Sequence, residues 1–159
     1  MKVLKSKRGE GYILPCVFIL IFSMIFAIVF MYISAVSMVN IMKENTKVVL
    51  DSFITQNATE IYSSIKQGND YIEDIDSEEF RTSLISFCTF EERNGKLYSI
   101  DENGTEKFHI SEPVITFQQE HELELMVNYT MSIPIYFAGA NVTTASIPMQ
   151  ISSILTEKF

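Results

Sequence analysis

The sequence predicts an α+β fold in which a long N-terminal helix packs on a small antiparallel β-sheet. Two observations lead to this prediction. Neither glycine nor proline occurs between Pro15 and Gly68, and from Thr89 onward apolar and polar residues alternate as they do in strands. Because the helix comes first and the strands follow, one sheet covering the outer part of the helix buries the apolar faces of both.

The first part of this helix is uncharged and strongly apolar. The 32 residues from Gly11 to Met42 contain no Asp, Glu, Lys, Arg or His, whereas roughly 20 apolar residues suffice to cross a bilayer. Thirteen Val, Ile, Leu or Phe residues lie between Val17 and Val36, and together they favour insertion by roughly 4 to 8 kcal/mol. The sequence therefore predicts a transmembrane helix over residues 12–42, with the lipid bilayer as its partner.

Three other interpretations of this segment agree less well with its residues. A cleaved secretory signal stays open, because the small residues at 34–37 resemble a cleavage site, but the apolar run before them is longer than such signals need. A lipoprotein signal is disfavoured, since the apolar run follows Cys16 instead of preceding it. A core helix of a soluble protein would show a polar face, and this segment has none.

Charge is distributed unevenly along the chain. Residues 1–11 carry a net charge of +3 and the rest carries −11, within a total of −8. Because basic residues beside a span prefer the cytoplasmic side, we expect residues 1–11 to form a cytoplasmic tail and residues 43–159 an extracytoplasmic domain. The protein would then be a single-pass protein of the cell membrane. The acidic balance excludes a nucleic-acid-binding surface, which requires a basic patch.

The helix is expected to continue past the membrane over residues 43–67. Apolar residues at helical spacing form one stripe: Leu50, Ile54, Ala58, Ile61 and Ile65. Gly68-Asn69 ends the helix. An acidic segment follows over residues 70–79, read as a solvated connection or, as the alternative, a calcium loop. Ser77 then caps a short second helix over residues 77–88.

Strands fill residues 89–159. Asn94-Gly95 and Asn103-Gly104 each predict a two-residue hairpin turn. The clearest alternation runs from Leu123 to Phe137 and predicts a long strand with one wet face, in which Pro134 marks an edge, a bulge or a change of course. The other expected strands are 96–100, 106–110, 114–117 and 145–151, with turns at 118–121 and 138–141.

Catalytic and metal-binding patterns are not found. His109 and His121 have no second ligand at metal-site spacing, and Cys88 does not complete a zinc set. Glu122 and Glu124 lie two apart, on one face of a strand, and are expected to form a solvated edge and not a catalytic pair. The sequence therefore predicts no enzymatic activity, no cofactor and no metal. Cys16 and Cys88 are each expected to be small buried residues, not partners in a disulfide.

The N-terminus resembles the start of TadE/TadF-like pseudopilins of tight-adherence pili, which are prepilin-like single-pass proteins. The resemblance rests on residues 7–15, Lys-Arg-Gly-Glu-Gly-Tyr-Ile-Leu-Pro, and on the apolar run that follows. It implies a processing region at Arg8, Gly9, Glu10 and Gly11, with Gly9 before the cut made by a prepilin peptidase and Glu10 as the family's acidic residue. The helix-then-sheet order is also pilin-like.

The resemblance implies a minor structural role in a Tad-type pilus or a related secretion or assembly apparatus. The partners would be other pilin-like or pilus-assembly subunits. Ser23 and Ala27, four residues apart, are candidates for close packing against a neighbouring helix. The alternative is a single-pass membrane protein with an extracytoplasmic binding domain that is neither processed nor part of a filament.

Overall fold

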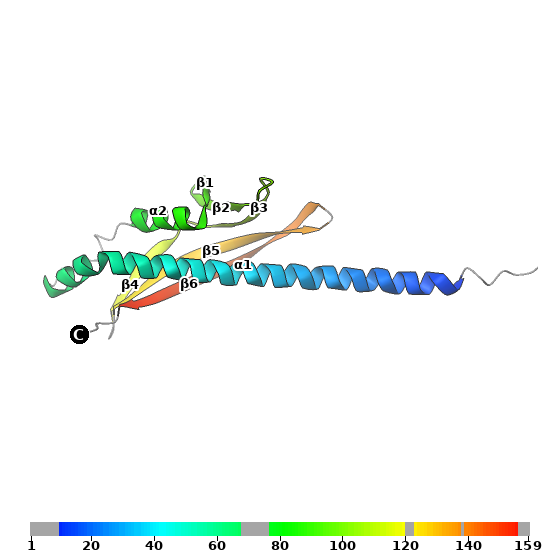
Figure 1. The fold of residues 1–159 in the computed structure, drawn as a ribbon, viewed down its shortest axis with the longest axis horizontal. Coiled ribbons are helices and arrows are strands. Elements are labelled where there is room, and N and C mark those ends of the chain that lie inside the picture. The colour runs from blue at the N-terminus through cyan, green and yellow to red at the C-terminus, as the bar shows by residue number, and fades with distance from the viewer. Residues whose placement is uncertain (1–9, 68–76, 120–122, 138, 156–159) are drawn as a thin grey trace, which may run out of the picture. The chain divides into compact units, whose positions relative to one another are not determined.

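The computed structural model describes residues 10–67, 77–119, 123–137 and 139–155, which form two helices and six strands (Figure 1). The chain divides into two compact units, Met1–Met38 and Val39–Phe159. Within the second unit, the outer part of helix α1 (Glu10–Gln67) packs on one antiparallel sheet, so the predicted α+β fold is confirmed. Met42 is buried in this unit, which therefore begins about one turn before the boundary expected after Met42.

Helix α1 begins at Glu10 and ends at Gln67. The end agrees with the stop predicted at Gly68-Asn69, whereas the start lies two residues before Tyr12. Pro15 consequently lies inside the helix and not in its first turn. Because proline has no N–H, the carbonyl of Gly11 lacks its usual i→i−4 donor there.

The buried face of α1 is wider than the predicted stripe. Leu50 and Ile54 are buried and Ala58 is half-buried, as expected, while the side chains of Ile61 and Ile65 lie outside the described residues. The buried residues of α1 are Met42, Thr46, Val49, Leu50, Phe53 and Ile54. Their spacing of three and four residues keeps them on one side of the helix.

The sheet is antiparallel throughout. Its strands are β1 (Glu91–Arg93), β2 (Lys96–Ile100), β3 (Glu106–Ile110), β4 (Val114–Gln119), β5 (Leu123–Phe137) and β6 (Ala140–Leu155). The order is β1-β2-β3-β5-β4, and β6 pairs with β5. Because β6 pairs with β5 along its whole length, β3 and β4 must share the other edge of β5, one after the other.

The long strand alternates as predicted. Its buried residues are Leu125, Val127, Tyr129, Met131 and Ile133. The register between β5 and β6 shifts at Ile135/Tyr136, one residue after Pro134, and β3 pairs with β5 only as far as Ser132. Pro134 therefore lies in a stretch where β6 is the only strand paired with β5, which suits a residue with no N–H to donate on the free side.

One predicted turn is confirmed and another is wrong. Asn94 and Gly95 have φ of 53° and 71°, as a two-residue hairpin turn requires. At Asn103-Gly104 only Gly104 has a positive φ, 79°, and the loop between β2 and β3 has five residues. There the carboxylate of Asp101 accepts hydrogen bonds from the N–H groups of Asn103 (2.9 Å) and Thr105 (2.7 Å), which favours the longer loop.

The turn expected at residues 118–121 is also corrected in part. Gln118 and Gln119 belong to β4, where they pair with Glu124 and Leu123; the pairing outweighs their polarity. The rest of that turn, including His121, lies outside the described residues, as does most of the acidic segment 70–79. The last strand, β6, is longer than the alternation at 145–151 predicts.

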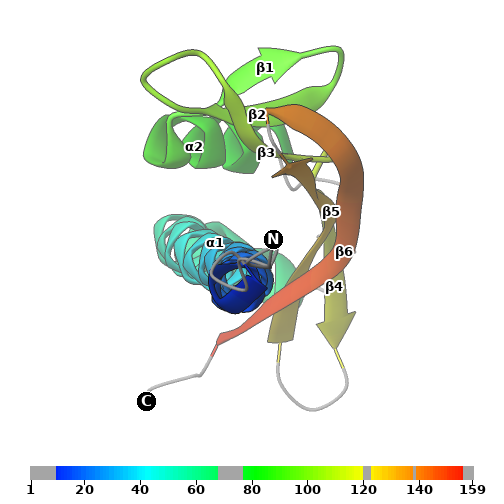
Figure 2. The same ribbon diagram turned by 90° about the vertical axis from the view of Figure 1, so that its right-hand side faces the viewer.

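Both helices of the second unit lie on the same face of the sheet. Figure 2 shows the outer part of α1 and helix α2 (Ser77–Cys88) on the concave side of the strands. Phe80 and Leu84 of α2 are buried, and the ring of Phe80 meets that of Phe53 edge-on, with 5.8 Å between centroids. The core is thus a single layer of side chains between the two helices and the sheet.

Candidate functional site

The first candidate is the apolar surface of α1. Within the described part of the first unit, the large apolar side chains from Ile13 to Val36 are exposed except for half-buried Met31, with no charged residue among them. An exposed apolar surface of this size is unfavourable in water, so we expect lipid or a partner protein to cover it. In the described chain α1 is the one helix long and apolar enough to span a membrane, which is consistent with a single-pass membrane protein.

Some of the residues named from the sequence lie on this helix. Arg8 and Gly9 lie outside the described residues, while Glu10 and Gly11 are the first two residues of α1. Ser23 and Ala27 are exposed one turn apart. Cys16 is also exposed, contrary to the expectation of a buried residue, because none of the described residues of the first unit packs over it.

A row of phenylalanines on α1 was not anticipated. Phe22 and Phe26 have ring centroids 5.6 Å apart, and Phe26 and Phe30 have theirs 6.2 Å apart. The signal is present in the sequence, since a spacing of four residues aligns side chains on one helix face. These rings lie one position before Ser23 and Ala27, so a bulky row and a small-residue patch run side by side.

The second candidate is a buried polar contact between α1 and the sheet. Thr46 is the one polar residue that the described part of the chain buries fully. Its hydroxyl donates to the carbonyl of Met42 (2.8 Å) and lies 2.9 Å from the hydroxyl of Tyr129. Because the Thr46 proton is already used, the Tyr129 hydroxyl is the donor to the Thr46 oxygen. This contact fixes the position of α1 along β5.

Neighbouring groups are held neutral by burial. Burial raises the pKa of Tyr129 to about 12. Burial likewise raises the pKa of Cys88 to about 11, opposed by a hydrogen bond with Asn45. A thiol with a raised pKa is a poor nucleophile, so Cys88 ties α2 to α1 structurally.

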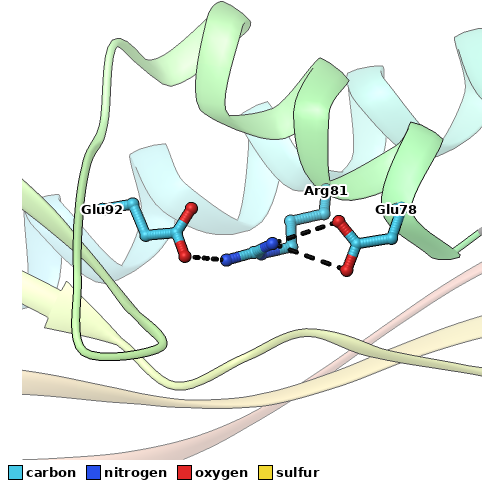
Figure 3. A network of polar contacts seen from close by, with 3 residues as sticks. All are labelled: Glu78, Arg81 and Glu92. Atoms are coloured by element: carbon cyan, nitrogen blue, oxygen red, sulfur yellow. Dashed lines mark hydrogen bonds and ion pairs between the residues drawn. The ribbon is translucent and has the colours of Figure 1, made fainter.

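The third candidate is a charged network between α2 and the β1–β2 hairpin. Arg81 donates to Glu78 (3.1 Å) on its own helix and to Glu92 on β1 (Figure 3). The Arg81 side chain is 16% exposed. The hydrogen bond with Glu92 is the main reason why the pKa of Arg81 is raised, and the hydrogen bond with Glu78 raises it further. The network fastens the hairpin to α2.

The described residues hold no group of three or more His, Cys, Asp or Glu side chains placed to bind a metal. His109 contacts Glu106 through Nδ1 (2.6 Å), and its ring lies 5.0 Å from that of Tyr98. These contacts place it in a local surface cluster. The described geometry thus offers surfaces and structural contacts.

Comparisons with protein-family models, with curated proteins and with solved structures found no match.

Proposed function

We propose that this chain is a membrane-anchored, pseudopilin-like structural component of a Tad-type pilus or a related secretion or assembly apparatus. The observation that carries the proposal is the exposed apolar length of α1, followed in the same helix by a buried face under a sheet. A helix with these two parts suits a subunit that is held in lipid and presents a folded domain outside it.

The proposed orientation follows from charge. The basic tail at residues 1–11 stays in the cytoplasm and the acidic second unit lies on the extracytoplasmic side. In this role the apolar part of α1 has two successive environments, the bilayer and a bundle of neighbouring subunit helices. The patch at Ser23 and Ala27 allows a neighbour to approach closely, and the adjacent row of phenylalanines packs beside it.

The proposed function is structural and not enzymatic. It requires the domain to keep a fixed relation between its helix and its sheet, and the contact between Thr46 and Tyr129 supports that requirement. It also requires a maturation step, in which a prepilin peptidase cuts after Gly9 and leaves Glu10 as the first residue.

A second candidate function is a single-pass membrane protein whose extracytoplasmic domain binds a partner without processing or filament assembly. One observation favours it: Gly9 and Glu10 are adjacent, whereas prepilins usually keep several residues between the glycine and the glutamate.

Intact mass of the chain extracted from membranes of cells that contain a prepilin peptidase decides between the two. The pseudopilin proposal expects a chain that has lost Met1–Gly9, and a Gly9→Val variant that keeps them. Ser6→Val, which places the same new side chain three positions earlier, is the control and is expected to be cut normally. A wild-type chain that remains full length in the membrane would overturn the pseudopilin proposal in favour of the second candidate.

A further inference from the structure

The β5–β6 hairpin lacks charge from Leu125 onward, and Glu124 at its base is the one charged residue of the two described strands. From Leu125 to Thr156 the sequence has 32 residues without Asp, Glu, Lys, Arg or His. The rest of the second unit is rich in acidic residues, so the hairpin is a separate chemical region of this domain. A strand pair with a solvated face normally carries charged side chains on it.

The tip of the hairpin exposes apolar and aromatic side chains. Tyr136 is 40% exposed and Val142 is 64% exposed. Tyr136 pairs with Asn141 across the hairpin, and Gly139 in the turn has a φ of 82°. Since β3 pairs with β5 only as far as Ser132, the tip extends beyond the rest of the sheet (Figure 1).

The direction of the hairpin follows from two contacts with α1 in the second unit. Ser153, which pairs with Leu125, donates to Asp51 (2.5 Å), and Tyr129 contacts Thr46 (2.9 Å). A step from Asp51 to Thr46, toward the start of α1, is therefore also a step along β5 toward the tip. The hairpin points to the Val39 end of the unit.

The reach of the tip follows from the same contacts. The step from Asp51 to Thr46 covers about 7 Å along the helix, and the matching step from Leu125 to Tyr129 covers about 13 Å along the strand. A given distance along β5 therefore corresponds to roughly half that distance along α1. Tyr136 is seven residues beyond Tyr129, or about 23 Å of strand, which corresponds to about 13 Å along α1. Val39 is about 10 Å from Thr46 by helical rise. The tip thus reaches the level of Val39.

We propose that Tyr136 and Val142 at this tip lie in the interfacial layer of the membrane that α1 spans, as a second contact between the outer domain and lipid. The inference rests on the proposed membrane anchoring. The occupant is lipid because the apolar stretch of α1 joins the outer unit at Val39, the end that the tip reaches. Tyrosine favours the interface, where its ring is apolar and its hydroxyl meets water, and the absence of charge removes the cost of bringing the hairpin to lipid.

The chain contains no tryptophan, so a single introduced Trp reports its own surroundings. Val142→Trp tests the tip, and Tyr136→Trp is a second reporter with a conservative change. Ile154→Trp is the matched control: Ile154 is 51% exposed and lies twelve residues further along β6, at the other end of the hairpin, where it pairs with Glu124. Each full-length variant is placed in phosphatidylcholine vesicles with and without brominated acyl chains, and vesicle flotation records anchoring.

We expect blue-shifted emission and a loss of fluorescence in brominated vesicles for Val142→Trp and Tyr136→Trp, with solvent-like and unquenched emission for Ile154→Trp. Variants that float with the vesicles but show no quenching at either tip position would overturn the inference and leave the anchoring intact. Blue-shifted emission without quenching would also overturn it, since protein and not lipid would then cover the tip. Failure of every variant to float would overturn the proposed anchoring itself.

Discussion

The buried contact between Thr46 and Tyr129 predicts strong coupling between two mutations 83 positions apart. Thr46→Val keeps the shape of the side chain but removes its hydroxyl. The Tyr129 hydroxyl then loses its acceptor, and Tyr129 is only 5% exposed. Leaving a buried polar group unpaired costs about 1 to 3 kcal/mol, which is the expected loss in the free energy of unfolding.

The partner mutation is expected to cost less. Tyr129→Phe removes the donor, while Thr46 keeps its bond to the Met42 carbonyl, so the loss is about 0.5 to 1.5 kcal/mol. The double variant has no stranded hydroxyl. Its loss should therefore fall short of the sum of the single losses by about 1 kcal/mol.

Urea-induced unfolding of the full chain in detergent micelles, followed by circular dichroism, measures all three variants. Thr55→Val is the matched control, because the Thr55 hydroxyl also donates to a carbonyl one turn earlier (Asp51, 2.7 Å) but is exposed; we expect a change below about 0.5 kcal/mol. Single losses that simply add would refute the reasoning, because the two hydroxyls would then not depend on each other.

Further predictions concern pH, a turn and the charged network. The pKa values of Tyr129 and Cys88 are raised to about 12 and about 11, so the folded state keeps protons that the unfolded state releases. The free energy of unfolding should therefore hold below about pH 9 and fall as pH rises toward 12. The expected fall in the free energy of unfolding is up to roughly 3 kcal/mol for Tyr129 and less for half-buried Cys88. Urea midpoints measured across this pH range test the prediction, and a midpoint that does not change with pH contradicts it. Gly95→Val should cost about 1 to 2 kcal/mol in urea unfolding, because a left-handed φ of 71° strains any Cβ-bearing residue; an unchanged midpoint refutes this. Arg81→Ala should lower the free energy of unfolding by about 1 kcal/mol, whereas Arg93→Ala, which breaks an exposed ion pair with Glu91, should lower it by less than about 0.5 kcal/mol. Equal losses in the same assay would show that Arg81 does not fasten the hairpin.

Periodicity, with turn and cap signals, was enough to predict a helix-then-sheet order, although the short strand β1 was not among the expected strands. The alternation from Leu123 to Phe137 and the Ser77 cap gave the residues of β5 and α2 as the structure has them, because long patterns have many positions that agree. The width of the buried face of α1 was not predictable. Phe53 packs against Phe80 of α2 and Thr46 contacts Tyr129 of β5, and a one-dimensional pattern does not show which neighbour will cover a helix.

Local signals failed where a tertiary or side-chain contact outweighed them. Asn103-Gly104 reads as a short turn, but the Asp101 carboxylate binds two N–H groups of the loop and stabilises a longer one. Gln118 and Gln119 are polar, yet pairing with β5 keeps them in β4. Thr46 gave no signal as a site, since a threonine on a helix is common and its partner Tyr129 is distant in sequence.

The direct test of the account is amide hydrogen exchange along α1 in the full-length protein embedded in lipid nanodiscs. The account predicts slow exchange without interruption from Ile13 to Asn57, because lipid protects the first part of the helix and the sheet protects the second. Fast exchange around Val39–Met42, or over the apolar residues before them, would contradict a single helix that passes from lipid into the folded domain.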